Sequence, residues 1–210
     1  YRLHFDPNHR ELIRLAREKD FGAFDRMDSL RSFKLGMRDG KKPWRAEHAL
    51  AGGGPLMDLG VYVVQAACMA KEEAMPVAVT ARELPKTRPE FFTDVEETLE
   101  FQMHFADGAV CDAVTSYERT GNQFRAAGPG GWINFETAFS YRGIKTTTSR
   151  GPLQFPVINQ QAVQMDDFAA CVLAGRESII PGEMGRRDMV IIEAIYEAAR
   201  SGKRIELSKA

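Results

Sequence analysis

Residues 51–62 read AGGGPLMDLGVY, a glycine loop that leads directly into an apolar segment. Glycine adopts backbone angles that other residues avoid, and Pro55 suits the first turn of a helix because its missing N–H would lack a partner there. Apolar residues then continue through Met69. The pattern therefore predicts a helix over residues 55–70, around which we expect the rest of the chain to be organised.

Asp58 and Tyr62 lie four residues apart on this predicted helix. Residues at that spacing share a helical face, and the start of a helix favours anionic groups. A carboxylate beside a phenol suits proton transfer at a hydroxyl. Taken alone, the pattern favours a structural role, in which Asp58 complements the helix dipole and Tyr62 is a half-buried aromatic residue.

The residues before this helix predict another helix and a strand. Residues 1–5 read as the end of a strand. Residues 7–20 are predicted to be helical because Asp6 is a good N-cap and apolar residues follow at helical spacing. Residues 24–35 alternate between apolar and polar, which predicts a strand, and residues 44–50 predict a short helical piece.

The middle of the chain is predicted to be mostly β structure with short connections. A strand over residues 76–81 and a loop over residues 85–94 come first. The clearest hairpin follows, because residues 99–105 and 109–117 alternate on either side of Asp107-Gly108.

Residues 128–131, GPGG, have the composition of a phosphate-binding loop. Phosphate binding requires a helix N-terminus after the glycines, whereas residues 132–135 read as a strand. We therefore predict a hairpin turn here, followed by another strand over residues 139–148.

The last third of the chain predicts two helices. A loop over residues 151–158 precedes helices over residues 160–173 and 186–200, and residues 204–207 are predicted to add an edge strand. The order of all these elements argues for an α+β domain whose helices cover one face of an antiparallel-rich sheet.

The composition is typical of a globular domain. The chain has 210 residues, a net charge of −1, 44% hydrophobic and 27% charged residues. It has no basic cluster and no long apolar run, so we expect neither nucleic acid nor a membrane as a partner. The three cysteines lie far apart in apolar segments, which favours buried thiols, and we expect no metal site.

Six segments carry a resemblance to a known family. They are YRLHFDPNHRELIRL at residues 1–15, Trp44-Arg45, ALAGGGPLMDLGVY at residues 49–62, FADGAV at residues 105–110, NQQAVQMDDFA at residues 159–169 and EAIYEAARSGKRIEL at residues 193–207. Together they resemble the C-terminal domain of the Gfo/Idh/MocA oxidoreductases over essentially the whole chain. The similarity is closest to the glucose-fructose oxidoreductase branch, which carries tyrosine at the position of Tyr62, where most of the family carries histidine.

The resemblance implies a fold and an activity. The fold would be α+β, with a large open, mostly antiparallel sheet and helices packed on one face. Residues 1–210 would form a single substrate-binding and oligomerisation domain. The activity would be hydride transfer between NAD(P) and a sugar, polyol or related carbinol or aldehyde.

In this family the cofactor is bound mainly by an N-terminal Rossmann domain. Its G-x-G-x-x-G fingerprint and its lysine in a Glu-Lys-Pro motif do not occur in this sequence. We therefore expect residues 1–5 to be a remnant of the link to that domain. The fragment alone would be inactive.

The resemblance also assigns roles to four residues. Tyr62 would be the general base for the hydroxyl proton, and such a base accelerates the step by roughly 10²–10⁴-fold. An unperturbed tyrosine has a pKa of about 10, so it would need a nearby cation, which the family's lysine would supply. Asp58 would bind a substrate hydroxyl and orient Tyr62. Arg45 would contact the cofactor, and Arg2 the substrate, at the cleft between the domains.

Purely structural roles are an alternative for several of these polar residues. Arg45 would make a surface ion pair, Arg2 would end a strand, and the polarity of a loop would account for Asn159 and Gln160. The competing hypothesis for the whole chain is a non-catalytic sugar-binding or oligomerisation module.

The resemblance implies a homodimer or a tetramer that assembles through the open face of the sheet. A face lined by Phe and Met would support this. The compartment is left open between cytoplasm and periplasm, because the branch includes exported enzymes whose signal would precede Tyr1. The sugar, the choice between NAD and NADP and the direction of the reaction are also left open.

Overall fold

A nine-stranded sheet is the centre of the fold, which a computed structural model describes for residues 1–207. The strands lie in the order β8-β7-β6-β5-β1-β4-β3-β2-β9, and every neighbouring pair is antiparallel except β1 with β4. The α+β class with a large open, mostly antiparallel sheet is thereby confirmed. The strands are β1 Arg26–Ser32, β2 Ala78–Glu83, β3 Thr98–His104, β4 Val110–Ser116, β5 Gly121–Gly128, β6 Gly131–Glu136, β7 Lys145–Thr148, β8 Gly151–Leu153 and β9 Ile205–Glu206.

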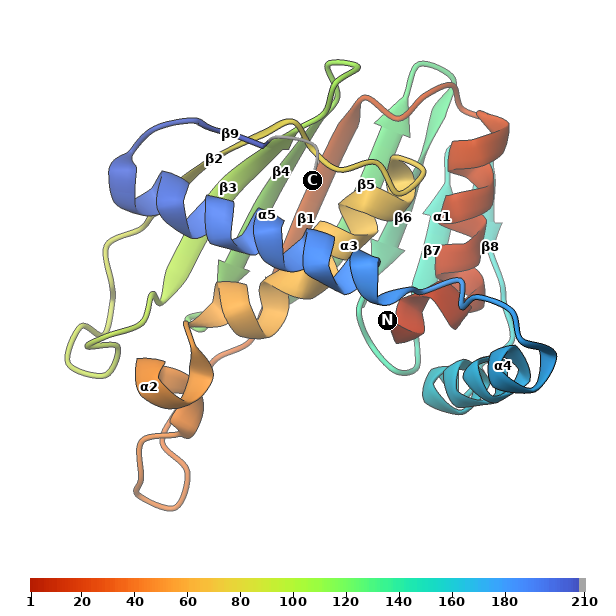
Figure 1. Ribbon diagram of the computed structural model, residues 1–210. Helices are drawn as coiled ribbons and strands as arrows, with labels where there is room; N and C mark the ends of the chain where they lie inside the picture. The colour runs from red at the N-terminus through yellow and green to blue at the C-terminus, as the bar shows by residue number, and fades with distance from the viewer. Residues whose placement is uncertain (208–210) are drawn as a thin grey trace.

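Three helices cover one face of this sheet (Figure 1). They are α1 (Pro7–Glu18), α3 (Val61–Ala70) and α5 (Gly182–Ser201), while α2 (His48–Ala51) and α4 (Gln160–Ala174) lie at its margin. The predicted N-cap of α1 is confirmed, because the Asp6 carboxylate accepts hydrogen bonds from the N–H groups of Asn8 and His9. Within residues 1–207 no helix is long and apolar enough to cross a membrane.

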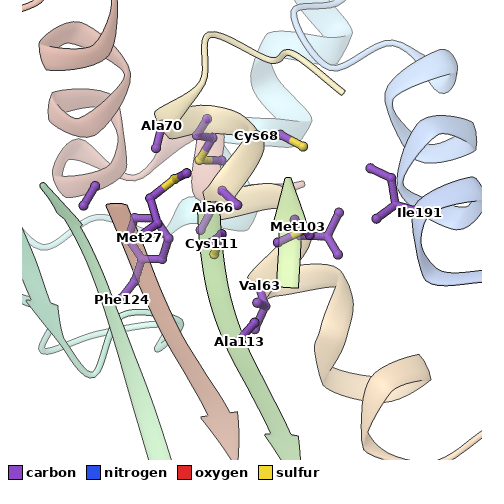
Figure 2. Close-up of a cluster of buried hydrophobic side chains, with 14 of the residues drawn as sticks. Met27, Val63, Ala66, Cys68, Ala70, Met103, Cys111, Ala113, Phe124 and Ile191 are labelled. Atoms are coloured by element: carbon purple, nitrogen blue, oxygen red, sulfur yellow. The ribbon is translucent and has the colours of Figure 1, made fainter. Parts of the chain in front are cut away.

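The hydrophobic core lies between α3, the sheet and α5 (Figure 2). Residues 63–70 of α3 are all buried, so this helix needs apolar neighbours on every side. Met27 of β1, Cys111 of β4 and Ile191 of α5 are among those neighbours. The helix that follows the glycine loop is therefore the one on which the other elements pack. All three cysteines are free and buried, as expected.

The opposite face of the sheet combines many polar side chains with a few small aliphatic ones such as Leu30 and Val114. The phenylalanines and methionines of the strands, such as Met27 and Phe124, point toward the helices and are buried. Because side chains alternate along a strand, the other face receives residues such as Asp28, Gln102 and Asp112. The structure therefore does not provide the Phe- and Met-lined surface that would have supported self-association.

Two predicted segments near the chain ends differ from the structure. Arg2–Phe5 form a 3₁₀ helix (η1) and not a strand end, because the N–H groups of His4 and Asp6 bond to carbonyls three residues earlier. α5 begins at Gly182, which is earlier than the predicted residue 186.

Two further boundary predictions fail around β7. Only Lys145–Thr148 of the predicted strand over residues 139–148 is extended, since a turn precedes it in which the Thr137 hydroxyl donates to the Gly143 carbonyl at 2.6 Å. Residues 151–158 were expected to be a loop, yet Gly151–Leu153 pair with β7 as β8. Both hairpin predictions, around Asp107-Gly108 and over residues 128–131, are confirmed.

Candidate active site

The glycine loop is held by a buried carboxylate. Glu96 accepts hydrogen bonds from the backbone N–H of Gly54 at 2.9 Å, from that of Leu56 at 3.0 Å and from the Tyr196 hydroxyl at 2.9 Å. A Cβ on Gly54 would lie 2.3 Å from the Glu96 carbonyl oxygen, so only glycine fits at this approach. Burial raises the pKa of Glu96. The anion-binding position at the start of the helix is thus already filled by a side chain of this chain.

The first turn of the predicted helix is wider than an α-helical turn. Leu56–Gly60 form a π-helical turn (η3), and α3 begins at Val61. Such turns are rare and are frequent at functional sites, and nothing in the sequence pattern predicted this one. Asp58 and Tyr62 nevertheless line the same cleft, as their spacing led us to expect.

Asp58 is anchored by side chains from two other segments. Its Oδ2 accepts a hydrogen bond from Nε of Arg45 at 3.1 Å and from the hydroxyl of Tyr117 at 2.9 Å. Burial and the Asp58 carboxylate raise the pKa of Tyr117, which keeps that hydroxyl protonated as a donor. Both contacts use Oδ2, so Oδ1 can accept a hydrogen bond from a ligand.

Tyr62 is half-buried, and two guanidinium groups lie near its ring. The Cζ atoms of Arg2 and Arg31 lie 5.4 Å and 5.9 Å from the centre of its ring. Its hydroxyl makes no hydrogen bond to another side chain or carbonyl within residues 1–207. The resemblance led us to expect a cation beside Tyr62 only from a lysine outside this chain, and the structure places two arginines there.

Arg2 is fixed by a buried polar network. It donates to the carbonyl oxygens of Phe139 at 2.6 Å and Ser140 at 3.2 Å and to the amide oxygen of Gln160. Gln160 in turn donates to the Asp6 carboxylate at 2.6 Å. Arg2 is only 8% exposed, and the network holds its guanidinium rigidly at the floor of the cleft.

Gln160 and Asn159 have separate structural roles. Gln160 is buried in the Arg2 network, so the interpretation by loop polarity is wrong for this residue. Asn159 is exposed and caps α4, since its Oδ1 accepts a hydrogen bond from the N–H of Ala162 at 3.1 Å.

The cleft consists of two adjoining lobes that share Arg2, Tyr62 and Tyr141. The larger lobe, of about 480 Å³, is completed by polar residues Arg31, Arg45, Asp58 and Ser140 and by apolar residues Phe33, Leu59 and Phe139. The smaller lobe, of about 330 Å³, is completed by Tyr1, Leu3, Val61, Gln65, Gln161 and Gln164. Tyr62 thus stands at the junction of a lobe with three arginines and a lobe whose other polar side chains are neutral.

All four residues proposed from the sequence meet in the larger lobe. Arg2, Arg45 and the segment that carries both Asp58 and Tyr62 are separate in the chain, and the fold brings them together. Arg45 does form an ion pair, but with Asp58 inside the cleft.

Sequence reasoning missed Arg31, Tyr117 and Tyr141. Arg31 had a readable signal, because it occupies an inward position of a central strand, where its neighbours Met27 and Ser29 are buried. Charged residues are rarely buried without a specific role. The contact of Tyr117 with Asp58 depends on how the helix packs on the sheet, so no local pattern predicts it.

The sequence matches a family profile and a protein of described activity. The family profile for the GFO/IDH/MocA C-terminal domain matches residues 9–134. The D-xylose 1-dehydrogenase [NADP(+)] of Haloarcula marismortui is 30% identical over 176 residues, which cover 78% of this chain and 47% of that protein. The chain therefore spans about half the length of this relative.

Solved structures share the fold. The aldose-aldose oxidoreductase of Caulobacter crescentus, crystallised with glycerol, is 36% identical, with a TM-score of 0.90 over 99% of this chain and 62% of that one. A levoglucosan dehydrogenase in complex with NADH and levoglucosan has a TM-score of 0.80 at 18% identity, over 99% of this chain and 65% of that one. The second similarity is evidence for the fold alone.

Proposed function

Because the chain belongs to the GFO/IDH/MocA C-terminal domain family, we propose that it is the substrate-binding part of an NAD(P)-dependent oxidoreductase that acts on a sugar or polyol. The single observation that carries this proposal is the cleft in which Tyr62 and Asp58 lie together. Support also comes from the relatives, which are described as an NADP-dependent xylose dehydrogenase and an aldose-aldose oxidoreductase.

Proton transfer is assigned to Tyr62. Oxidation of a carbinol breaks its O–H bond and its C–H bond and forms a carbonyl group. Tyr62 takes the hydroxyl proton, and Asp58 accepts a hydrogen bond from a neighbouring hydroxyl through Oδ1, which fixes the substrate relative to the phenol. Arg45 and Tyr117 hold the Asp58 carboxylate in place for this role.

The residues present fit only the reacting end of a dinucleotide cofactor. When bound, NAD(P)⁺ supplies the acceptor for the hydride that leaves the carbinol carbon. Within residues 1–207 the one glycine loop that opens a helix has its N–H groups taken by Glu96, so it cannot cradle phosphates. We propose that the phosphates are bound by a separate nucleotide-binding domain and that Arg45 contacts the cofactor at the edge of the cleft. Residues 1–210 alone would then not catalyse the reaction.

The assay uses the full-length protein with NAD⁺ or NADP⁺ and a panel of aldoses and polyols. We expect reduced nicotinamide to form, detected by its absorbance, with one or more of these substrates. A protein that binds sugars but never reduces the cofactor would instead favour the competing hypothesis of a non-catalytic sugar-binding or oligomerisation module.

We also propose that the full-length protein is a homodimer or a tetramer assembled through the open sheet face. This face carries a hollow of about 800 Å³ between Arg82, Glu100, Asp112 and Arg125. Its acidic and basic side chains would allow a polar, self-complementary contact. Light scattering should give the mass of two or four protomers, and a monomer at micromolar concentration would contradict the proposal.

A further inference from the structure

The candidate cleft holds more positive charge than its own carboxylate can neutralise. Arg2, Arg31 and Arg45 line the larger lobe together with one acid, Asp58. Asp58 is paired with Arg45. Within residues 1–207 neither Arg2 nor Arg31 forms an ion pair. Two guanidinium charges therefore face the ligand space without an acidic partner.

Arg31 is the more exposed of these two charges to a ligand. It lies on β1, in register with Thr115 of β4 and Asn122 of β5. Its Nε is buried and finds no acceptor in the described part of the chain. Burial lowers the pKa of the Arg31 guanidinium, and the nearby charge of Arg2 acts in the same direction. An unpaired, partly buried cation is unfavourable until an anion reaches it.

The smaller lobe has a different character. Apart from Arg2, which both lobes share, it presents the amides of Gln65, Gln161 and Gln164. The Tyr1 hydroxyl donates to the Asp188 carboxylate at 2.7 Å. Gln65 is only 3% exposed, and its side-chain nitrogen has no acceptor among residues 1–207. Neutral amides suit the hydroxyl groups of a carbohydrate.

We propose that the cleft takes a sugar acid, a carbohydrate that carries a carboxylate. Arg31 binds the carboxylate in the larger lobe, Arg2 adds favourable charge, and Gln65 contacts a hydroxyl in the smaller lobe. A guanidinium group matches a carboxylate with two parallel hydrogen bonds. This inference rests on the proposed function, because it names the substrate class of the same site.

The phosphates of the cofactor are a second possible source of the anion. In a nicotinamide dinucleotide a ribose separates the pyrophosphate from the reacting ring. Arg31 lies against the ring of Tyr62, the residue assigned to the reacting hydroxyl. A group in that position meets the substrate, which favours the sugar carboxylate.

The test compares matched sugars with the full-length protein, for example glucuronate with glucose and galacturonate with galactose. The quantity measured is the ratio of kcat/KM for the uronate to kcat/KM for the aldose. The unmodified protein is expected to favour the uronate by at least about tenfold, and Arg31→Gln to lower the ratio by about 10–100-fold, as expected for losing a charge-assisted hydrogen bond. Arg31→Lys keeps the positive charge but cannot make two parallel hydrogen bonds to a carboxylate, so it should give an intermediate ratio.

Arg26→Gln is the matched control. Arg26 lies on the same strand but is exposed and outside the cleft, so its loss should leave the ratio unchanged. A protein that favours the neutral aldose, or an Arg31→Gln variant that loses both activities equally, would overturn the proposal. If Arg31→Gln does not fold, the test rests on Arg31→Lys. A uronate-to-aldose ratio below that of the unmodified protein supports the proposal, and an unchanged ratio overturns it.

Calorimetric titration separates this inference from the proposed function. Glucuronate binding that depends on Arg31, without any cofactor reduction, would retain the sugar-acid site and reject the oxidoreductase. If the cofactor is reduced but the uronate-to-aldose ratio is the same in the Arg31 variants, the oxidoreductase is retained and the sugar-acid site is rejected. An Arg31→Gln variant that weakens NAD(P)⁺ binding and leaves the ratio unchanged would assign the anion to the cofactor and overturn the proposal.

Discussion

Tyr62→Phe in the full-length protein is expected to lower kcat for sugar oxidation by about 10²–10⁴-fold. The change removes only the phenol oxygen, to which, in its deprotonated form, we assign the proton of the carbinol hydroxyl. Because the Tyr62 hydroxyl makes no hydrogen bond within residues 1–207 and the ring keeps its contact with Phe139, the fold should stay intact. Steady-state kinetics and the melting temperature of the variant measure the two effects separately.

Tyr141→Phe is the matched comparison for this experiment. Tyr141 lines both lobes of the cleft, but it is exposed and we assign it no proton transfer. Its loss should raise KM by less than about tenfold, as expected for one hydrogen bond to a ligand. Normal turnover in the Tyr62→Phe variant would remove Tyr62 from the mechanism.

Glu96→Ala is expected to lower the free energy of unfolding by about 3–5 kcal/mol. The change leaves two backbone N–H groups at the start of the helix and the hydroxyl of Tyr196 without their acceptor. Urea denaturation measures the loss. Glu118→Ala removes an exposed carboxylate and should change stability by less than about 0.5 kcal/mol. Similar stabilities for the two variants would show that Glu96 does not hold the loop.

The destabilisation by Glu96→Ala should depend on pH. Burial raises the pKa of Glu96 above its ordinary value of 4.5. Folding therefore favours the protonated form of Glu96. Its contribution to the free energy of unfolding is fully present below pH 4.5 and declines as the pH rises through the pKa that Glu96 has in the folded protein. The stability difference between the unmodified protein and the variant should be larger at the acidic end of this range. A difference that grows toward alkaline pH would contradict this assignment.

Most of the fold was predictable because its signals are local. The hairpin around Asp107-Gly108 and the N-cap at Asp6 depend on residues that are close in the sequence, and both are confirmed. The π-helical turn over Leu56–Gly60 was not predictable, since no residue pattern distinguishes it from an α-helical turn. The short strand β8 was missed because two prolines nearby made residues 151–158 read as a loop, although Gly151–Leu153 pair with β7 after a turn at Ser149 and Arg150.

The candidate site was predictable only in part. Asp58 and Tyr62 are neighbours on one helix, so their common face could be derived from spacing. Tyr117 reaches them from the end of β4 and Arg31 from β1, and such contacts depend on strand order. That order includes one parallel pair that no hairpin dictates. The contact of Tyr117 with Asp58 is therefore one that the sequence could not show.

The position of β1 in the sheet affects how the domain folds. Arg26 at its start pairs with Val110 on one side and with Ala127 on the other, so both neighbours of β1 lie far along the chain. The strands on either side, β2 to β4 and β5 to β8, are consecutive in the chain within each group and can pair without β1. Bringing β1 between them requires the closure of long loops, which is entropically costly and slow. Because Arg31 lies on β1 and Tyr62 does not, the binding cleft is complete only after this long-range step.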